Sequence, residues 1–427
     1  MTHSGRTFRF TCGERSVPAA EGLLRSQGFA FEPEPFYALA RRLVREPFPL
    51  GESLAARFGL VYIQDRSSML PPLTLAPPEG ACVLDMCSAP GSKTGLLSRL
   101  VGREGFVFAT EPSADRLSTL RANLRRTCSA NAATAKAMAQ DLPFADGTWD
   151  YIQLDPPCSG WGTVDKNPKV MELWSESKTA PLVALQKTLL KKAADLLKPG
   201  GVVLYSTCTT NIEENERQAT WALESLDLEL EPLSEPKGFV FGEPLVPGLD
   251  GVLRVAEDSD GQGFFLARFR KKAGCSATSG GHVQKRELPG VRLDLASMPG
   301  GEGLDLSALP PGEVYAFNGK AFFLHRRALE MIPGRVRWQG FPLGKATGKG
   351  KGMKFIPAPL ARVLLPDDPA DARADVLDVE DTAVLERLFT GREVRFAKGA
   401  GPVGLYYRGL ALGWLSRKGE RLLWSAK

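Results

Sequence analysis

The sequence lacks the features that mark several common classes of protein. Its 427 residues include seven cysteines and three histidines, and the cysteines are scattered without a CxxC pair. This pattern offers neither a disulfide framework nor a metal site, and it suits a reducing compartment. No apolar run approaches the roughly 18 residues of a membrane span, and no apolar leader stands near residue 1. We therefore expect a cytoplasmic protein that holds no metal and contacts no membrane.

The charge and composition are those of a globular protein with several domains. The formal net charge is +5, and 43% of the residues are hydrophobic. A net charge this small is not enough to bind nucleic acid by overall charge alone. A basic surface therefore has to come from local clustering of lysines and arginines. At roughly 150 residues per domain, the length predicts about two or three domains.

A regular alternation of strand-like and helix-like stretches begins near residue 81. The strand-like runs are short and apolar, and helical stretches of about 10 to 20 residues separate them. The strand-like runs cover residues 81–86, 105–110, 149–154 and 201–206, and the helical stretches cover 93–100, 114–126 and 181–197. This rhythm predicts a Rossmann-like α/β domain with a doubly wound, mostly parallel sheet.

Changes in composition and hydrophobic pattern along the sequence divide the chain into four segments. We expect an N-terminal extension over residues 1–70 that packs on the α/β domain, which covers residues 71–272. Residues 273–281 are small and polar, which is typical of a linker. Residues 282–427 contain short strand-like runs punctuated by glycine, and they predict a small β-rich C-terminal module.

The loops that follow the strands are the places to look for a ligand, because open parallel sheets bind ligands at the carboxyl ends of their strands. The first such loop, DMCSAPGSKT, begins at Asp85 and is rich in small residues. It lacks the glycines of a phosphate-binding P-loop and of a dinucleotide fingerprint, which argues against nucleotide hydrolysis and hydride transfer. Backbone N–H groups in such a loop can approach a ligand closely.

An acidic residue follows each of four strands, namely Asp85, Glu111, Asp141 and Asp155. One such residue alone is equally well read as a helix cap or a solvated turn. Four acidic residues at equivalent strand ends together predict a site for a ligand with ribose hydroxyls, an adenine amine and an ammonium group. S-adenosylmethionine carries those donors.

Two cysteines also follow strands into the expected crevice. Cys158 stands in LDPPCSG, and Cys208 stands in YSTCTTNIEENE. Most free cysteines are inert small hydrophobes, and Cys82, inside a strand, is expected to be one of them. Cys158 and Cys208 are candidates for chemistry because of their place at the sheet edge.

These motifs, in this order and preceded by YIQDRSSMLPP, resemble the RNA cytosine-C5 methyltransferases of the Sun (NSUN)/RsmF family over roughly residues 60–270. The overall layout is most similar to the bacterial RsmF-type enzymes that act on 16S rRNA. Carbon 5 of cytosine is a weak nucleophile, so a thiolate must first add at carbon 6. The resemblance implies that Cys208 is this nucleophile, that Cys158 assists proton removal or product release, and that Asp155 polarises the cytosine. Lys93 is a candidate for lowering the thiol pKa or orienting the base.

The same resemblance implies a binding site for S-adenosylmethionine. Its loop would supply Cys87, Ser88, Ala89, Pro90, Gly91, Ser92 and Lys93. Glu111 would bind the ribose, Asp141 would lie near the adenine, and Asp155 would lie at the methionine end. Arg116 fits the family pattern and is equally well read as a helix-surface residue.

A basic segment between Arg335 and Lys354 is a candidate RNA contact, because it contains no acidic residue and interleaves Trp338 and Phe341 with its basic residues. A solvated Gly/Lys loop is the alternative, and the resemblance favours a PUA-like or related RNA-binding module. The candidates are Arg335, Arg337, Trp338, Lys345, Lys349, Lys351 and Lys354. The acidic stretch from Asp367 to Asp381 is expected to be a surface loop or a helix start.

The leading hypothesis is therefore a monomeric, S-adenosylmethionine-dependent RNA cytosine-C5 methyltransferase that acts through a covalent adduct on 16S rRNA or the small ribosomal subunit. A tRNA substrate is an alternative. An enzyme that methylates an exocyclic nitrogen would normally place an aromatic residue after the two prolines, where Cys158 stands. A ribosome-assembly or RNA-binding factor that keeps the fold without turnover is the alternative from another class.

Overall fold

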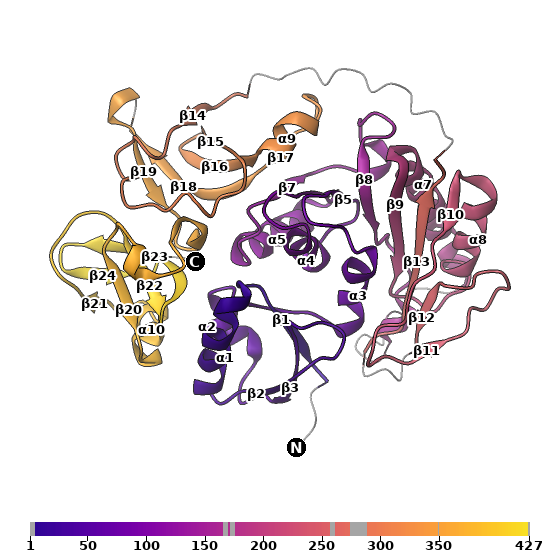
Figure 1. The fold of residues 1–427 in the computed structure, drawn as a ribbon, viewed down its shortest axis with the longest axis horizontal. Helices are drawn as coiled ribbons and strands as arrows, with labels where there is room; N and C mark the ends of the chain where they lie inside the picture. The colour runs from indigo at the N-terminus through magenta and orange to yellow at the C-terminus, as the bar shows by residue number, and fades with distance from the viewer. Residues whose placement is uncertain are drawn as a thin grey trace.

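The computed structural model describes residues 5–164, 170, 176–256, 261–273, 288–348 and 350–425. Within these residues the strands form four sheets, which Figure 1 shows arranged around one another. The expected linker lies almost wholly outside the described residues. No helix in the described part of the chain combines the length and the apolar character needed to cross a membrane.

The first sheet belongs to the N-terminal segment and has the strand order β2-β3-β1-β4. Its elements are β1 (Thr7–Phe10), α1 (Val17–Ser26), β2 (Ala30–Pro33), β3 (Ala40–Arg45), α2 (Leu54–Arg57) and β4 (Val61–Ile63). Ala40 packs with Met69 and Leu96 of the next segment. The N-terminal sheet is thereby attached to the helices of the α/β part.

The second sheet is the large central one, and its core strands run in the order β7-β6-β5-β8-β9, all parallel. The central strands are β5 (Cys82–Asp85), β6 (Phe106–Thr110), β7 (Ala132–Ala135), β8 (Trp149–Leu154) and β9 (Leu197–Thr207). Beyond β9, antiparallel strands complete the sheet: β10 (Leu228–Leu230), β11 (Phe241–Gly242), β12 (Leu253–Val255) and β13 (Phe264–Lys271). This is the predicted doubly wound α/β fold. The strand order reverses between β5 and β8, so the loops after these strands lie side by side.

Helices cover both faces of the central sheet because each carries one apolar stripe. The helices are α3 (Arg66–Leu75), α4 (Ser92–Leu100), α5 (Ala114–Arg126), α7 (Glu176–Leu196) and α8 (Glu216–Ser225). In α5, Leu117, Leu120 and Leu124 are buried at helical spacing, and Ser113 caps the first turn by accepting from the Arg116 amide. α3, α4 and α5 share one core, while α7 and α8 pack on the opposite face.

The C-terminal region differs from the expected single module, because it contains two sheets. The third sheet comprises β14 (Val291–Leu293), β15 (Gly312–Phe317), β16 (Lys320–His325), β18 (Phe341–Thr347) and β19 (Lys354–Pro357). The fourth comprises β20 (Val376–Val379), β21 (Val394–Arg395), β22 (Val403–Tyr407), β23 (Leu410–Lys418) and β24 (Arg421–Leu423), with helix α10 (Thr382–Phe389).

The C-terminal region is also joined to the central sheet. The two-residue strand β17 (Trp338–Gln339) pairs antiparallel with β7. Helix α9 (Arg326–Met331) places Ala328 in the core of the central sheet, and the His325 ring stacks on Phe106 with centroids 5.4 Å apart. A strand of two residues leaves no periodic pattern, so the sequence could not reveal this connection.

The fourth sheet packs against the first, so the two ends of the chain share a core. Phe58 contacts Phe389 and Trp424, with ring centroids 4.7 and 5.2 Å away. The Arg362 guanidinium donates to the carbonyl oxygens of Phe58 and Gly59. Figure 1 shows the yellow C-terminal sheet beside the indigo N-terminal one.

Candidate active site

The loop after β5 is held in a narrow turn that opens helix α4. Gly91 has φ +102°, and a Cβ there would lie 2.8 Å from the Leu120 Cδ1 atom, so only glycine fits. The Gly91 amide donates to the Ser88 carbonyl at 2.7 Å, and the Ser88 hydroxyl donates to the Thr110 carbonyl at 2.8 Å. The loop is therefore fixed to β6 before any ligand binds.

Side chains of α5 hold the same loop from the other side. The Arg116 guanidinium donates to the Ala89 carbonyl at 3.1 Å, and the Asn123 amide donates to the Pro90 carbonyl at 2.9 Å. Arg116 also lies 3.5 Å from a Glu111 carboxylate oxygen. Arg116 is therefore largely exposed, as a helix-surface residue would be, and it also braces the loop.

Three carboxylates converge around the start of this loop. Burial and the charges of Asp85, Asp155 and Glu111 raise the pKa of the Cys87 thiol. Burial raises the pKa of Asp85 to about 7, although the Thr94 hydroxyl donates to its Oδ2 at 2.6 Å. The other oxygen of Asp85 is buried without a hydrogen-bond partner in the described chain.

This arrangement fits S-adenosylmethionine, which brings hydroxyl and ammonium donors and two positive charges. Glu111 is 1% exposed and accepts the Ser113 amide at 2.9 Å, which fixes one of its two oxygens. A buried acceptor without a partner, at Asp85, is a free energy cost that a donor-rich ligand removes. Asp141 ends the short 3-10 helix η3 (Ala139–Asp141) and is exposed.

The two strand-end cysteines meet at the edge of β8 and β9. Their Sγ atoms lie 3.3 Å apart, both as free thiols. The hydrogen bond from Cys158 lowers the pKa of Cys208, and the positive charge of Lys93 lowers it further, against burial and the charge of Asp155. The hydrogen bond to Cys208 and burial raise the pKa of Cys158. Of the two thiols, Cys208 is therefore the more easily ionised.

Lys93 and Asp155 form an ion pair beside the two sulfurs. The Lys93 Nζ atom lies 2.8 Å from Asp155 Oδ2, and the Ser206 hydroxyl donates to Asp155 Oδ1 at 3.0 Å. Burial alone would lower the pKa of Lys93, but the Asp155 charge outweighs it and the pKa is raised. The ammonium group stays charged next to Cys208, which is the condition for stabilising a thiolate.

A buried carboxylate that the sequence analysis did not single out connects the two cysteine loops. Glu214 is fully buried and accepts hydrogen bonds from the Ser159 amide at 2.9 Å and the Ser159 hydroxyl at 2.5 Å. It also accepts from Gln186 at 2.9 Å and from Asn211 at 3.1 Å. Ser159 follows Cys158, and Asn211 lies three positions beyond Cys208, so one side chain sets the spacing of both sulfurs. The sequence shows the motif NIEENE that contains Glu214, but it does not show that the Glu214 side chain is buried.

The structure divides the predicted basic segment among three elements. Arg335 is exposed and donates to the Pro143 carbonyl at 3.1 Å, and Arg337 is exposed. Trp338 lies in β17 and packs half-buried on the core of the central sheet. Phe341 is 3% exposed, so the expectation that it stacks on RNA is wrong. Lys349 lies outside the described residues, as does the side chain of Lys351.

The remaining two basic candidates lie on the outer face of the third sheet. Lys345 faces Lys320 and Ile356 across neighbouring strands, and Lys354 pairs with Thr347. On the same sheet, Phe317 pairs with Lys320, and its ring stacks on Tyr315 with centroids 6.0 Å apart. Exposed lysines and half-buried aromatic rings thus share one face.

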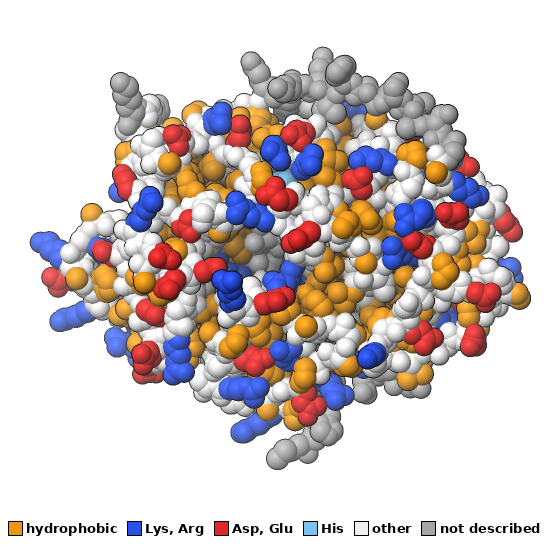
Figure 2. All heavy atoms as spheres, in the orientation of Figure 1, with side chains coloured by type: hydrophobic (Ala, Val, Ile, Leu, Met, Phe, Trp, Pro, Cys, Tyr) orange, Lys and Arg blue, Asp and Glu red, His pale blue; other side chains and the backbone are white. Residues whose placement is uncertain are grey.

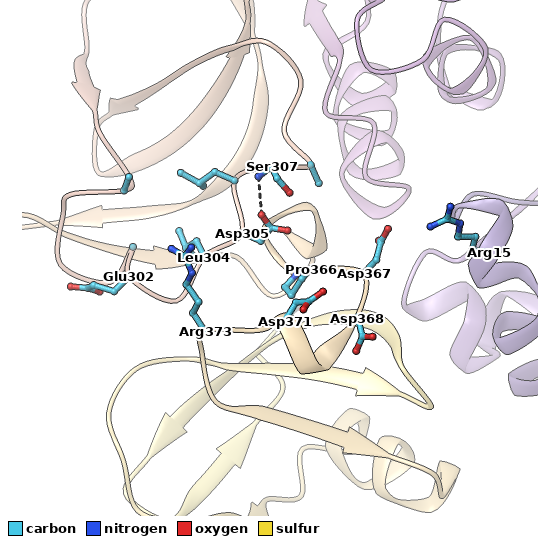
Figure 3. A pocket seen from close by; sticks show the side chains of 14 residues that line it. Arg15, Glu302, Leu304, Asp305, Ser307, Pro366, Asp367, Asp368, Asp371 and Arg373 are labelled. Atoms are coloured by element: carbon cyan, nitrogen blue, oxygen red, sulfur yellow. Dashed lines mark hydrogen bonds between the residues drawn. The ribbon is translucent and has the colours of Figure 1, made fainter.

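An acidic pocket of about 850 Å³ lies between the third and fourth sheets. Figure 3 shows its carboxylates, and Arg15 on the far side; the acidic residues are Glu302, Asp305, Asp367, Asp368 and Asp371. The stretch 367–381, expected as a loop or a helix start, runs along this pocket, forms β20, and ends at Asp381, which caps α10 by accepting the Ala383 amide at 2.9 Å. Its negative charge repels phosphate groups.

A doubly wound sheet with this loop and these carboxylates at its strand ends defines an S-adenosylmethionine-dependent methyltransferase. The family model described as 16S rRNA methyltransferase RsmB/F matches residues 72–270. The ribosomal RNA small subunit methyltransferase F of Citrobacter koseri is 31% identical over 98% of this chain and 88% of its own length. The chain therefore belongs to the 16S rRNA methyltransferase RsmB/F family.

Solved structures agree with this assignment. A methyltransferase homologue from Pyrococcus horikoshii is 34% identical, with a TM-score of 0.55, over 62% of this chain and 86% of that chain. NSun6 from Pyrococcus horikoshii, crystallised with SFG, an S-adenosylmethionine analogue, shares the fold at 22% identity. Its TM-score is 0.55, over 62% of this chain and 90% of that one.

Proposed function

We propose that this protein methylates carbon 5 of cytosine in the RNA of the small ribosomal subunit. The observation that carries the proposal is the Cys158–Cys208 pair, whose Sγ atoms lie 3.3 Å apart with opposite pKa shifts. Methylation of an exocyclic nitrogen needs no thiolate, whereas methylation at carbon 5 needs one that adds to carbon 6.

In the first step, the Cys208 thiolate adds to carbon 6 of the cytosine and makes carbon 5 nucleophilic. Lys93 keeps Cys208 ionised, and Asp155, fixed by Lys93 and Ser206, binds the N3/N4 edge of the base. S-adenosylmethionine, when bound, supplies the methyl group. The loop at Gly91 and the carboxylates of Asp85 and Glu111 hold it.

In the second step, a water molecule takes the proton from carbon 5, the electron pair left behind restores the double bond between carbons 5 and 6, and the Cys208 sulfur leaves carbon 6 as a thiolate. The thiol of Cys158 hydrogen-bonds to that sulfur and stabilises it as it leaves. On this ground we assign Cys158 to product release, in addition to its effect on the ionisation of Cys208.

The substrate class follows from the relatives, which are named as small subunit ribosomal RNA methyltransferases. We propose that the C-terminal region over residues 282–427 binds this RNA, and that the outer face with Lys345 and Lys354 contributes. Lysines supply phosphate contacts and aromatic rings stack on unpaired bases. The acidic pocket, which five acidic residues line, is not part of this RNA contact.

The test is transfer of labelled methyl groups to unmodified 16S rRNA, small subunits and tRNA, followed by identification of the nucleoside. We expect 5-methylcytidine in ribosomal RNA, no transfer by Cys208→Ala, and a stable protein–RNA adduct with Cys158→Ala. Label in N4-methylcytidine would contradict methylation at carbon 5. Label in tRNA alone would contradict ribosomal RNA as the substrate. RNA binding without transfer to any of them would favour a non-catalytic factor.

A further inference from the structure

A second, smaller cavity lies beside α4, where Gly95, Ser98 and Arg99 of that helix line it. It has a volume of about 250 Å³ and forms where β1, α4, the loop after α5 and the C-terminal region meet. Three arginines line it, Arg9, Arg99 and Arg103, together with hydroxyl groups such as those of Ser98 and Ser129. None of the residues that line it is acidic. We refer to this cavity as the arginine pocket.

The most buried of these arginines has no acidic partner. Arg9 is 1% exposed, and its guanidinium donates to the Gln64 side-chain oxygen at 3.0 Å and the Ser92 carbonyl at 3.1 Å. Its third contact is the face of the Tyr62 ring, 5.2 Å away. In the described part of the chain no carboxylate pairs with it. A buried charge held only by neutral groups is costly, and an anion nearby would offset this cost.

The other two arginines have at most one weak acidic neighbour among the described residues. Arg99 donates to the Cys12 carbonyl at 2.9 Å, and its one carboxylate neighbour, Glu14, lies 3.9 Å away on a side chain that is 84% exposed. Arg103 is exposed and pairs with no acid among the described residues. Exposed pairs of this kind contribute little and are easily displaced.

The two neighbouring pockets differ in their balance of charge, because five acidic residues and two arginines line the acidic pocket, whereas, among the described residues, three arginines and no acidic one line the arginine pocket. The acidic pocket adjoins the arginine pocket, because Ala308 lines both. Figure 2 shows acidic and basic side chains around a hollow where the C-terminal sheets meet the rest of the molecule. An anion that approaches this region is repelled by one pocket and attracted by the other.

We propose that the arginine pocket binds a phosphate group. A phosphate has several acceptor oxygens in a compact tetrahedron, which suits three guanidinium groups and adjacent hydroxyls. Its source is either the RNA backbone or free phosphate, and the RNA source rests on the proposed function. In both cases the bound phosphate ties the N-terminal sheet, through Arg9, to α4.

The first arm of the test measures free phosphate. We expect sodium phosphate to raise the Tm of the wild-type protein by about 2 °C over sodium chloride of equal ionic strength. The double variant Arg99→Gln/Arg103→Gln should lose this rise. Arg373→Gln, which lies in the acidic pocket, should keep it and serves as the matched control.

The second arm measures RNA. The log–log salt slope of binding to unmodified 16S rRNA should fall in the double variant by about 0.7 for each single-strand phosphate that is no longer neutralised. A smaller slope assigns the pocket to the RNA backbone. A phosphate-dependent Tm with an unchanged slope assigns it to free phosphate. The proposal is overturned by an unchanged slope together with a phosphate effect on Tm that the wild type lacks or that the double variant keeps. Formation of 5-methylcytidine is scored separately, so failure of the proposed function is distinguishable.

Discussion

The Sγ atoms of Cys158 and Cys208 lie 3.3 Å apart although fifty positions separate the residues in the chain. The pKa of Cys208 is lowered and that of Cys158 is raised, with their shared hydrogen bond as the first cause of both shifts. In the proposed reaction, one sulfur thus helps the other to ionise.

Removing the Cys158 thiol should make Cys208 harder to ionise. In Cys158→Ala the hydrogen bond that contributes most to lowering the Cys208 pKa is gone. We expect the pH midpoint for alkylation of Cys208 by iodoacetamide to move upward, with less reaction at neutral pH. Mass spectrometry of the modified peptide measures it, and an unchanged midpoint would show that the sulfurs are independent.

Lys93→Met should slow methyl transfer by about 10²-fold. The change removes the positive charge beside Cys208 and leaves the Asp155 carboxylate without its ion pair. Single-turnover transfer to RNA measures the effect. Lys198→Met is the control, since Lys198 pairs with Asp150 on the surface and should leave the rate unchanged.

Glu214→Gln should lower kcat more than it changes KM. The amide keeps the volume of the carboxylate but replaces an acceptor with a donor that faces Ser159 or Gln186. We expect a loss of about 1–3 kcal/mol in the free energy of unfolding, together with slower alkylation of Cys208. Glu213→Gln changes an exposed neighbour and should have neither effect. A loss of stability with normal kcat would mean that Glu214 does not position the sulfurs.

Gly91→Ala should abolish binding of S-adenosylmethionine at ordinary concentrations. The new Cβ would collide with Leu120 and displace the loop, while the positive φ adds about 1–2 kcal/mol of strain. Gly80→Ala carries a similar strain at φ +82° with open space around the Cβ, and calorimetry should show normal binding. Equal binding by both variants would contradict this account of the loop.

Lys345→Gln/Lys354→Gln should weaken binding to small-subunit RNA and reduce its salt slope, by up to about 0.7 for each phosphate that these lysines neutralise in the wild type. Both lysines are exposed on the outer face of the third sheet. Filter binding across a salt series measures the slope, with Lys198→Gln as the control. If affinity and slope match the wild type, this face does not contact RNA.

The sequence predicted those parts of the site that depend on the sheet alone. Parallel strands bring their carboxyl ends to one edge, so Asp85, Glu111, Cys158 and Cys208 could be placed near one another from the strand pattern. Glu214 could not be found in this way, because an acidic residue in a helix-like stretch is expected to face solvent. It is buried among partners from two other segments, Ser159 and Gln186, and from its own turn, Asn211.

The sequence also could not predict how the sheets of the C-terminal region are arranged. The strands of the third and fourth sheets were partly visible as short apolar runs, but their contacts are long-range. β17 and α9 attach the region to the central sheet through few residues, and the basic segment is divided as a result. Phe341 was misassigned because its alternation with basic residues is that of a strand with one buried face.

The contact of Phe58 with Phe389 and Trp424 has a consequence for synthesis on the ribosome. Translation proceeds from the N-terminus at about 5–20 residues per second. The helix that covers Phe58 is therefore synthesised roughly 15–70 s after Phe58 itself. During that time the first sheet exposes an aromatic surface. The nascent chain should therefore need protection until α10 and Trp424 emerge, and the first sheet should become resistant to proteases only after that.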